Sequence, residues 1–321
     1  MRDAFAKELH AAARRDDRVV LLSGDIGNRM FDEFKGEFPD RFYNCGVAEA
    51  NMMSVAAGMA MSGMRPVVYT IAPFVTTRCL EQIRVDVCYH RQPVVIVGTG
   101  GGLSYASLGG THHSCEDIGF LRMLPEMSVV CPGDAVEVRG ALRAALQCTG
   151  PVYLRLGKKG EPVVHKSDPE FILGRSLTVR QGDAVALLAV GNVLPIACTA
   201  AELLAARGLS ARVDSFHTVK PIDEICLADV FARYALVVTI EEHGIAGGAG
   251  SAVAEWLARR PHGRSRLLAL GTSDKFLHEA GSQAHARRAF GLTPEAIADE
   301  VHTAWQQTGS TRTANGARSR G

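Results

Sequence analysis

The pattern of apolar and polar residues along this chain consists of two kinds of segment in alternation. Short apolar runs of strand length are succeeded by amphipathic segments of helix length, a pattern typical of parallel sheets with helical crossovers. In the first half it predicts strands at residues 19–23, 42–45, 67–71, 93–98, 128–131 and 152–155. It predicts helices at residues 2–14, 48–62, 76–89, 114–123 and 135–147.

The alternation stops at a charged stretch with Gly and Pro and then resumes. Residues 158–181 are expected to form a linker. The second alternation predicts strands at 184–190, 211–216, 235–241 and 266–270, and helices at 194–206, after Pro221, and at 250–259, 283–290 and 294–305. We therefore expect two open, mostly parallel α/β domains, 1–157 and 182–307, followed by a small, polar and basic tail, 308–321, that is disordered.

Composition and charge exclude several classes of protein. The 321 residues are 47% hydrophobic with a net charge of +1, so no bulk field favours nucleic acid or an acidic membrane. No apolar run reaches the roughly 18 residues of a membrane helix, and the start has no signal-peptide core. The eight cysteines show no zinc-ligand spacing and lie mostly in apolar runs, which favours a reduced, cytoplasmic protein.

A glutamate begins the helix expected after the second strand. Glu49 lies in the segment FYNCGVAEANM, at the edge of the sheet where α/β proteins bind ligands. Taken alone, a carboxylate in a first turn is simply favoured by the helix dipole. Its neighbours change the interpretation, because NCGVAEANMMSVAAGMA resembles the pyrimidine-domain motif of transketolases and 1-deoxyxylulose-5-phosphate synthases.

The resemblance implies thiamine diphosphate as cofactor and gives Glu49 a catalytic role. In these families the glutamate contacts N1′ of the aminopyrimidine, and a protonated or strongly hydrogen-bonded carboxyl there favours the imino tautomer that activates the thiazolium carbon. The next strand ends in VVYTIAPF, which resembles the segment that packs against the pyrimidine. Phe74 fits the stacking position. Ile71 stands where transketolases more often have an aromatic residue, and packing in the core is the alternative for both.

A Gly-rich loop after the fourth expected strand contains the second part of the resemblance. GGTHHSCEDIGFLR is similar to the transketolase segment GPTHQ…E…LR, which implies that His112 faces the substrate as a hydrogen-bond donor to a developing alkoxide. This loop departs from the family at two positions. Gly100 replaces a histidine and Leu108 replaces an aspartate, both of which normally contact sugar hydroxyls or phosphate. The usual sugar-phosphate donors are therefore in doubt.

Three further residues match the family at single positions. Arg155, in GPVYLRL, and Arg2, near the start, match arginines of the phosphate site, and a guanidinium suits a phosphate. Asp25, in SGDIGN, matches an aspartate near the cofactor. A solvated terminal arginine and a routine turn aspartate are the alternatives for Arg2 and Asp25.

The resemblance covers nearly the whole chain and still lacks half of the cofactor site. In these families Mg²⁺ and the diphosphate are held by another domain, with a GDG motif and a downstream asparagine, and GDG is absent here. No metal-ligand cluster is expected in this chain. We therefore expect a split subunit whose partner carries the GDG motif and binds Mg²⁺, self-associating as an α2β2 assembly and acting on small sugars.

Two other functions remain open at this stage. The β subunit of a 2-oxoacid dehydrogenase has the same two domains but lacks the loop containing His112. A non-catalytic nucleotide-binding α/β protein, as in electron-transfer flavoproteins, would not depend on Glu49. The second-domain segments EEHGIAGGAGSAVAEWLA and GTSDKFLHEAGSQAHARRAFGLTPEAIADEV resemble the C-terminal domain of transketolases, which normally supports dimerisation.

Overall fold

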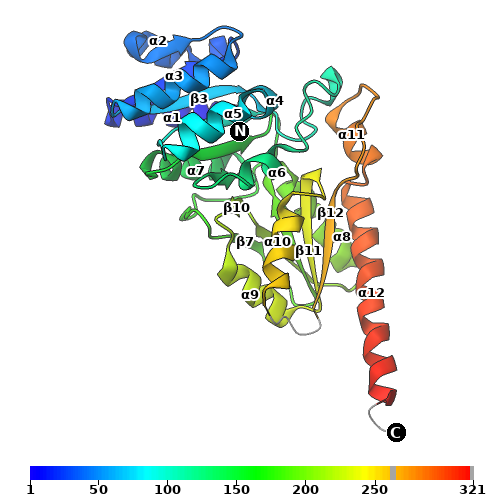
Figure 1. Cartoon of the computed structure of the whole chain (residues 1–321). Coiled ribbons are helices and arrows are strands. Elements are labelled where there is room, and N and C mark those ends of the chain that lie inside the picture. The colour runs from blue at the N-terminus through cyan, green and yellow to red at the C-terminus, as the bar shows by residue number, and fades with distance from the viewer. Residues whose placement is uncertain (261–264, 319–321) are drawn as a thin grey trace.

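A computed structural model describes residues 1–260 and 265–318 and divides them into two stacked α/β units (Figure 1). The first sheet has seven strands in the order β10-β5-β6-β4-β3-β1-β2. Its strands are β1 (Val19–Ser23), β2 (Phe42–Asn44), β3 (Arg65–Ile71), β4 (Val95–Thr99), β5 (Ser128–Val130), β6 (Val152–Leu156) and β10 (Thr218–Lys220). All neighbours in this sheet are parallel except β10 and β5, so the expected fold class is confirmed.

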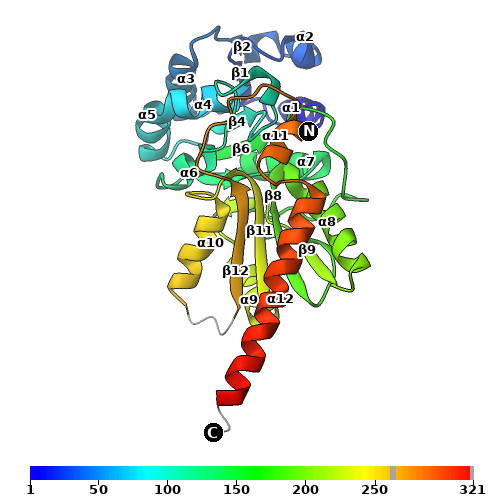
Figure 2. The same ribbon diagram turned by 90° about the vertical axis from the view of Figure 1, so that its right-hand side faces the viewer.

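The second sheet has five strands in the order β12-β11-β8-β9-β7. They are β7 (Leu177–Arg180), β8 (Val185–Val190), β9 (Ala211–Ser215), β11 (Leu236–Gly244) and β12 (Arg266–Thr272). Only β7 runs antiparallel to its neighbour. Helices cover both faces of this sheet, as Figure 2 shows. On one face lie α9 (Glu224–Arg233) and α10 (Ala249–Ala258), and on the other α8 (Leu194–Ala206) and α12 (Pro294–Arg318).

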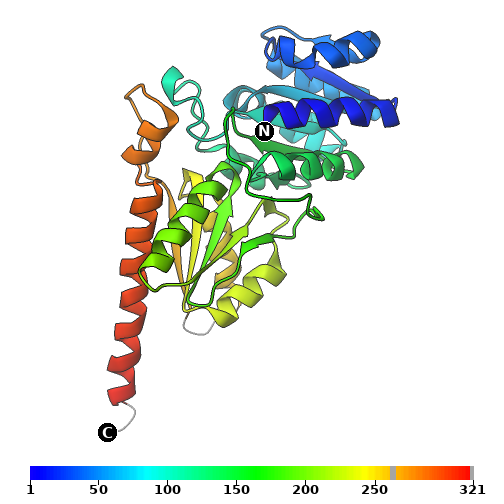
Figure 3. The same ribbon diagram turned by 180° about the vertical axis from the view of Figure 1, so that it is seen from behind.

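Helices also cover both faces of the first sheet. On one face α1 (Arg2–Arg15) packs beside α7 (Ala135–Gln147), as seen from behind in Figure 3. On the other face lie α3 (Glu49–Met61), α4 (Ala72–Val75), α5 (Leu80–Gln82), a π-helix (Ile83–Tyr89) and α6 (Asp117–Arg122). The apolar core of this face continues into the second unit through Phe216, Leu227 and Trp256. The two units therefore share one buried apolar core.

Several features differ from the sequence expectations. The helix expected at residues 76–89 is divided into a single turn (Thr77–Cys79), α5 and the π-helix. The linker is shorter than residues 158–181, because Leu177–Arg180 form the edge strand β7. The short strand β10, in the second half of the sequence, extends the first sheet. Helix α2 (Asp32–Glu37) was not predicted. Finally, the expected disordered tail is helical as far as Arg318, because α12 continues through it, while residues 319–321 lie outside the described part of the chain.

The remaining elements complete the framework of the site. Three single-turn helical segments, Asn28–Phe31, Pro39–Arg41 and Thr77–Cys79, join strands and helices of the first unit, and two more, Ala106–Leu108 and Gly191–Val193, lie in loops. The last helix before α12 is α11 (Gln283–Ala289). All eight cysteines are free. Among the described helices, none combines the length and apolarity that a membrane crossing requires.

Candidate active site

The expected catalytic glutamate lies at the carboxyl edge of the first sheet. Glu49 is the first residue of α3 and its residue surface is only 2% exposed. A Cβ on Gly24, directly after β1, would lie 3.3 Å from Cγ of Glu49 and 3.1 Å from Oγ1 of Thr70, in β3. Oγ1 of Thr70 is buried without a hydrogen-bond partner in the described chain. This edge thus holds a buried carboxylate next to an unpaired hydroxyl.

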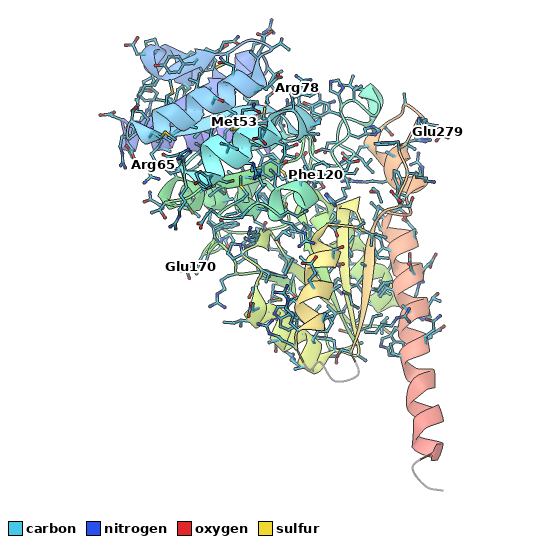
Figure 4. All side chains as sticks on the ribbon, viewed as in Figure 1. Met53, Arg65, Arg78, Phe120, Glu170 and Glu279 are labelled. Atoms are coloured by element: carbon cyan, nitrogen blue, oxygen red, sulfur yellow. The ribbon has the colours of Figure 1, made fainter. Side chains whose placement is uncertain are left out.

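An arginine that no sequence motif indicates pairs with this glutamate. Arg78 Nη1 donates to Oε2 of Glu49 at 2.7 Å. Its guanidinium lies over the ring of Phe74, 4.3 Å from the centroid, and its side chain is 44% exposed. Figure 4 labels Arg78 on the first unit, near α4. No local motif indicates this contact, because Phe74 lies before the helix that the sequence predicts at residues 76–89.

The loop that contains His112 approaches the same aromatic ring. The His112 and Phe74 rings are 5.2 Å apart between centroids in an edge-to-face arrangement. His112 Nδ1 is 2.9 Å from Oγ1 of Thr111. Burial, aided by the neighbouring His113, lowers the pKa of His112 below its usual value, so a neutral imidazole is favoured near pH 7. The structure therefore brings Glu49, Phe74 and His112 together, as the sequence resemblance implied.

Tyr105 explains why the loop has a glycine at position 100. Gly100 has a φ of +77°, and a Cβ there would lie 2.0 Å from Cε2 of Tyr105. The space that a side chain at position 100 would need is thus filled by the Tyr105 ring. That ring lies 6.1 Å from the ring of His112, and Nζ of Lys158 is 4.4 Å from its centroid. Neither Tyr105 nor Lys158 was predicted, and no local pattern distinguishes them.

Three other expected residues lie at the same edge in different surroundings. Leu108 ends a helical turn of the loop and is 51% exposed. Ile71, the last residue of β3, is buried, which matches the packing alternative. Asp25 is exposed, has a left-handed backbone with φ of 54°, and accepts a hydrogen bond from Nδ2 of Asn44 at 3.0 Å. This geometry fits the turn interpretation of Asp25.

The two arginines expected to bind phosphate lie in opposite environments. The Arg155 side chain is 3% exposed and pairs through Nε with Oδ2 of Asp117 at 2.8 Å. It also donates to the carbonyl oxygens of Ser114 and Glu242. These contacts occupy the guanidinium inside the protein, so the expectation that Arg155 binds substrate phosphate is corrected. Arg2, in contrast, has a buried Nε without a hydrogen-bond partner in the described chain.

These residues fit one end of thiamine diphosphate. A buried carboxylate, an aromatic ring and an unpaired hydroxyl are the groups that an aminopyrimidine needs for hydrogen bonding and stacking. For the Mg²⁺-diphosphate end the described residues offer less. Across 1–260 and 265–318, no group of three or more His, Cys, Asp or Glu side chains is arranged to hold a metal ion. The groups that gather around Glu49 thus suit the organic ring of the cofactor.

Comparisons with known proteins agree with this geometry. The model of the transketolase pyrimidine binding domain matches residues 1–161, and that of the transketolase C-terminal domain matches residues 174–297. A 6-deoxy-6-sulfo-D-fructose transketolase subunit SqwH of Clostridium sp. is 36% identical over 94% of this chain and 93% of its own length. An apulose-4-phosphate transketolase subunit of Actinobacillus succinogenes is 35% identical over 88% of this chain and 91% of its own length.

A solved structure gives the same result for the fold and for the sequence. A split gene transketolase, described as an inactive β4 tetramer, superposes with a TM-score of 0.87 at 34% identity. The match covers 95% of this chain and 98% of the other. The alternatives of a 2-oxoacid dehydrogenase β subunit and of a non-catalytic nucleotide-binding protein lose their support against these matches. The chain belongs to the transketolase family, of which it contains the pyrimidine-binding and C-terminal domains.

Proposed function

We propose that this chain is one subunit of a thiamine-diphosphate-dependent transketolase that moves a two-carbon ketol unit from a ketose donor to an aldehyde acceptor. The observation that carries the proposal is the series of contacts from Glu49 through Arg78 and Phe74 to His112. It links a buried carboxylate to a histidine across one aromatic ring. Thiamine diphosphate, when bound, supplies the carbon nucleophile that accepts the ketol unit.

Each residue of the series has a chemical task in this proposal. Glu49 holds a proton at the pyrimidine N1′, and Phe74 stacks against the ring. Arg78 is half exposed, so its guanidinium can leave the carboxylate for solvent when a ring nitrogen takes its place. His112, with Nδ1 near Thr111, presents Nε2 to the donor oxygen on which negative charge develops.

A partner chain is part of the same proposal. It would carry the GDG motif and hold Mg²⁺ and the diphosphate, which this chain does not provide for. In support, α3 has apolar residues on its exposed side as well as its buried side, and Val55 and Met61 are solvent-exposed. Exposed apolar residues that gather on one helix can mark a surface that other protein covers. We infer an α2β2 assembly, placed in the reducing cytoplasm because the cysteines are free.

We propose that the ketose donor carries an anionic group and that the enzyme recognises its hydroxyl groups only weakly. The two relatives above are named for a sulfonated ketose and for a sugar phosphate. With Arg155 buried, Arg2 and Lys158 are the cations of the described chain that we assign to such a group, since both lie near Tyr105. Leu108 and Gly100 offer no polar group to a sugar hydroxyl, and an apolar wall discriminates hydroxyls only weakly.

Reconstitution tests the proposal. The chain is purified alone and again after co-expression with the GDG-containing chain encoded nearest to it. We expect the isolated chain to bind thiamine diphosphate weakly and to turn nothing over, whereas the pair binds it with Mg²⁺ and transfers ketol units. Calorimetry and an assay with xylulose 5-phosphate, a deoxy analogue and pyruvate measure both. Tight Mg²⁺-dependent binding by the isolated chain would refute the shared site.

A further inference from the structure

The loop that contains His112 is closed at its base. The backbones of Gly102 and Ser114 form an antiparallel bridge, with each N–H donating to the other's carbonyl oxygen at 2.9 Å. The segment between these two residues, which includes Tyr105 and His112, begins and ends at this bridge. The position of the base therefore constrains where His112 lies relative to Phe74.

A carboxylate from the second unit holds the first side of this base. Glu242, near the end of β11, is fully buried and accepts a hydrogen bond from the backbone N–H of Leu103 at 3.0 Å. The loop lies directly on this side chain, since a Cβ on Gly102 would be 2.6 Å from Cβ and Oε2 of Glu242. A side-chain contact thus joins the C-terminal domain to the candidate active-site loop.

Three polar side chains of the second unit fix this carboxylate in turn. Arg287, in α11, forms an ion pair with Glu242 through Nε. Gln283 Nε2 donates at 3.0 Å and Asn192 Nδ2 at 3.3 Å. Figure 1 shows α11 beside the loop. With donors on both carboxylate oxygens, the Glu242 side chain has little freedom to move. Its hydrogen bond from Leu103 therefore restricts the backbone of Leu103 as well.

The backbone of the same strand holds the second side of the base. The N–H of Gly244 donates to the carbonyl oxygen of Cys115 at 2.8 Å. The carbonyl oxygen of Glu242 accepts from Arg155 Nη2, which also donates to the carbonyl oxygen of Ser114 at 2.7 Å. The buried Arg155 is thus one of the groups that join β11 to the loop, and both sides of the base rest on residues 242–244.

We propose that Glu242 is a positioning residue for His112, so that the C-terminal domain sets the geometry of the donor site as well as supporting assembly. Glu242 does not contact His112 and acts through Leu103 and the loop base. The inference rests on the function proposed above. Removing its charge leaves the partly buried Arg287 against a neutral group and weakens the contact with Leu103, which frees the loop.

The neighbouring residue provides a matched control. Glu241 is 1% exposed on the same strand and accepts hydrogen bonds from the N–H groups of Ala249 and Gly250, both at 2.8 Å, at the start of α10. It has no contact with the loop that contains His112 in the described chain. Glu241→Gln and Glu242→Gln therefore make the same chemical change at the same depth, one toward α10 and one toward the loop.

The first test needs no activity and uses the full-length chain. In Glu242→Gln we expect amide hydrogen exchange in residues 103–113 to be roughly 10-fold faster. We also expect the pKa of His112, followed by NMR, to rise toward its ordinary value as burial is lost. Glu241→Gln should change neither. Unchanged exchange and titration in folded Glu242→Gln, or equal changes in both variants, would overturn the proposal.

A second arm uses the reconstituted enzyme. We expect Glu242→Gln to lower kcat/KM for xylulose 5-phosphate roughly 10- to 100-fold, while deuterium exchange at the cofactor C2 stays normal. If wild type itself shows no cofactor-dependent turnover, the proposed function fails, whereas the loop measurements still decide this inference. Should Glu242→Gln not fold, Gln283→Ala removes one donor to the carboxylate and should speed loop exchange less. No change in Gln283→Ala would then overturn the inference.

Discussion

Two buried glutamates near the loop that contains His112 differ in their hydrogen bonding. Glu49 and Glu242 are both almost fully buried, and each pairs with an arginine. Glu242 accepts hydrogen bonds from a backbone N–H and three side chains, and the Arg287 side chain is only 19% exposed. In the described chain Glu49 has a single partner, Arg78, whose side chain is 44% exposed.

The difference separates a group built for a ligand from a group built for the fold. A buried carboxylate costs little only when its oxygens are satisfied, which is the case for Glu242. At Glu49 the acceptor capacity is incompletely used, and the neighbouring Thr70 hydroxyl has no partner in the described chain. Such unsatisfied groups at the edge of a parallel sheet are what a cofactor ring would complete.

The largest expected effect comes from exchanging the two glutamates for glutamine. Glu49→Gln should lower ketol transfer by the reconstituted enzyme at least roughly 100-fold, because an amide cannot donate the proton required at N1′. Its free energy of unfolding should change by less than about 1 kcal/mol, since Arg78 returns to solvent. Glu242→Gln should cost about 3 kcal/mol or more. Turnover assays and urea unfolding measure both.

Two results would contradict this comparison. Near-normal deuterium exchange at the cofactor C2 in Glu49→Gln would remove its assigned role. A larger loss of stability in Glu49→Gln than in Glu242→Gln would show that the apparent difference in hydrogen bonding has no energetic meaning.

An intermediate effect is expected from the loop itself. Leu108→Asp restores a carboxylate that can hydrogen-bond a sugar hydroxyl. It should raise the ratio of kcat/KM for xylulose 5-phosphate over its deoxy analogue roughly 10-fold. The side chain is half exposed, so stability should change by less than about 0.5 kcal/mol. Ile225→Asp, an exposed apolar residue of α9, is the control for added charge. A ratio that stays the same, with wild type already preferring xylulose 5-phosphate strongly, would contradict this interpretation of Leu108.

The smallest effect concerns a third buried carboxylate, which joins the linker to α7. Burial raises the pKa of Glu137 to about 7. His165 lies 3.4 Å from it, and although burial lowers the pKa of His165, its hydrogen bond to Asp134 raises that pKa above the usual value. Both groups bind protons more tightly when folded, so the stability that they contribute is fully present below pH 4.5 and is lost as the pH rises through about 7.

Glu137→Gln should flatten this dependence. The difference in melting temperature between wild type and Glu137→Gln should narrow, or reverse, from pH 5 to pH 8. The corresponding change in unfolding free energy is on the order of 1 kcal/mol. Burial opposes the ionisation of Asp134, but hydrogen bonds from His165 lower its pKa, so Asp134 stays ionised over this range and contributes no slope. A gap that does not vary with pH would show that Glu137 is ionised at both ends.

Much of the fold could be predicted from the sequence because its elements are locally encoded. Helix α7 begins and ends at the predicted residues, and Asp134 caps it by accepting hydrogen bonds from the N–H groups of Val136 and Glu137. The parallel strands were located to within three residues by their apolar runs. The edge strands β7 and β10 were missed, since three or four residues acquire strand character only from the neighbours with which they pair.

Local motifs were enough to establish the family, the two α/β units and the residues that gather at the site, because Glu49, Phe74 and His112 each lie in a segment that can be recognised on its own. Which charged groups remain available for a ligand depended instead on the folded arrangement. Arg155 lies in a motif that implied a phosphate site, yet Asp117 and two backbone carbonyls occupy it. Arg78, Tyr105 and Glu242 entered the site without any motif. Whether a side chain is satisfied depends on partners distant in sequence, so no local pattern contains that information.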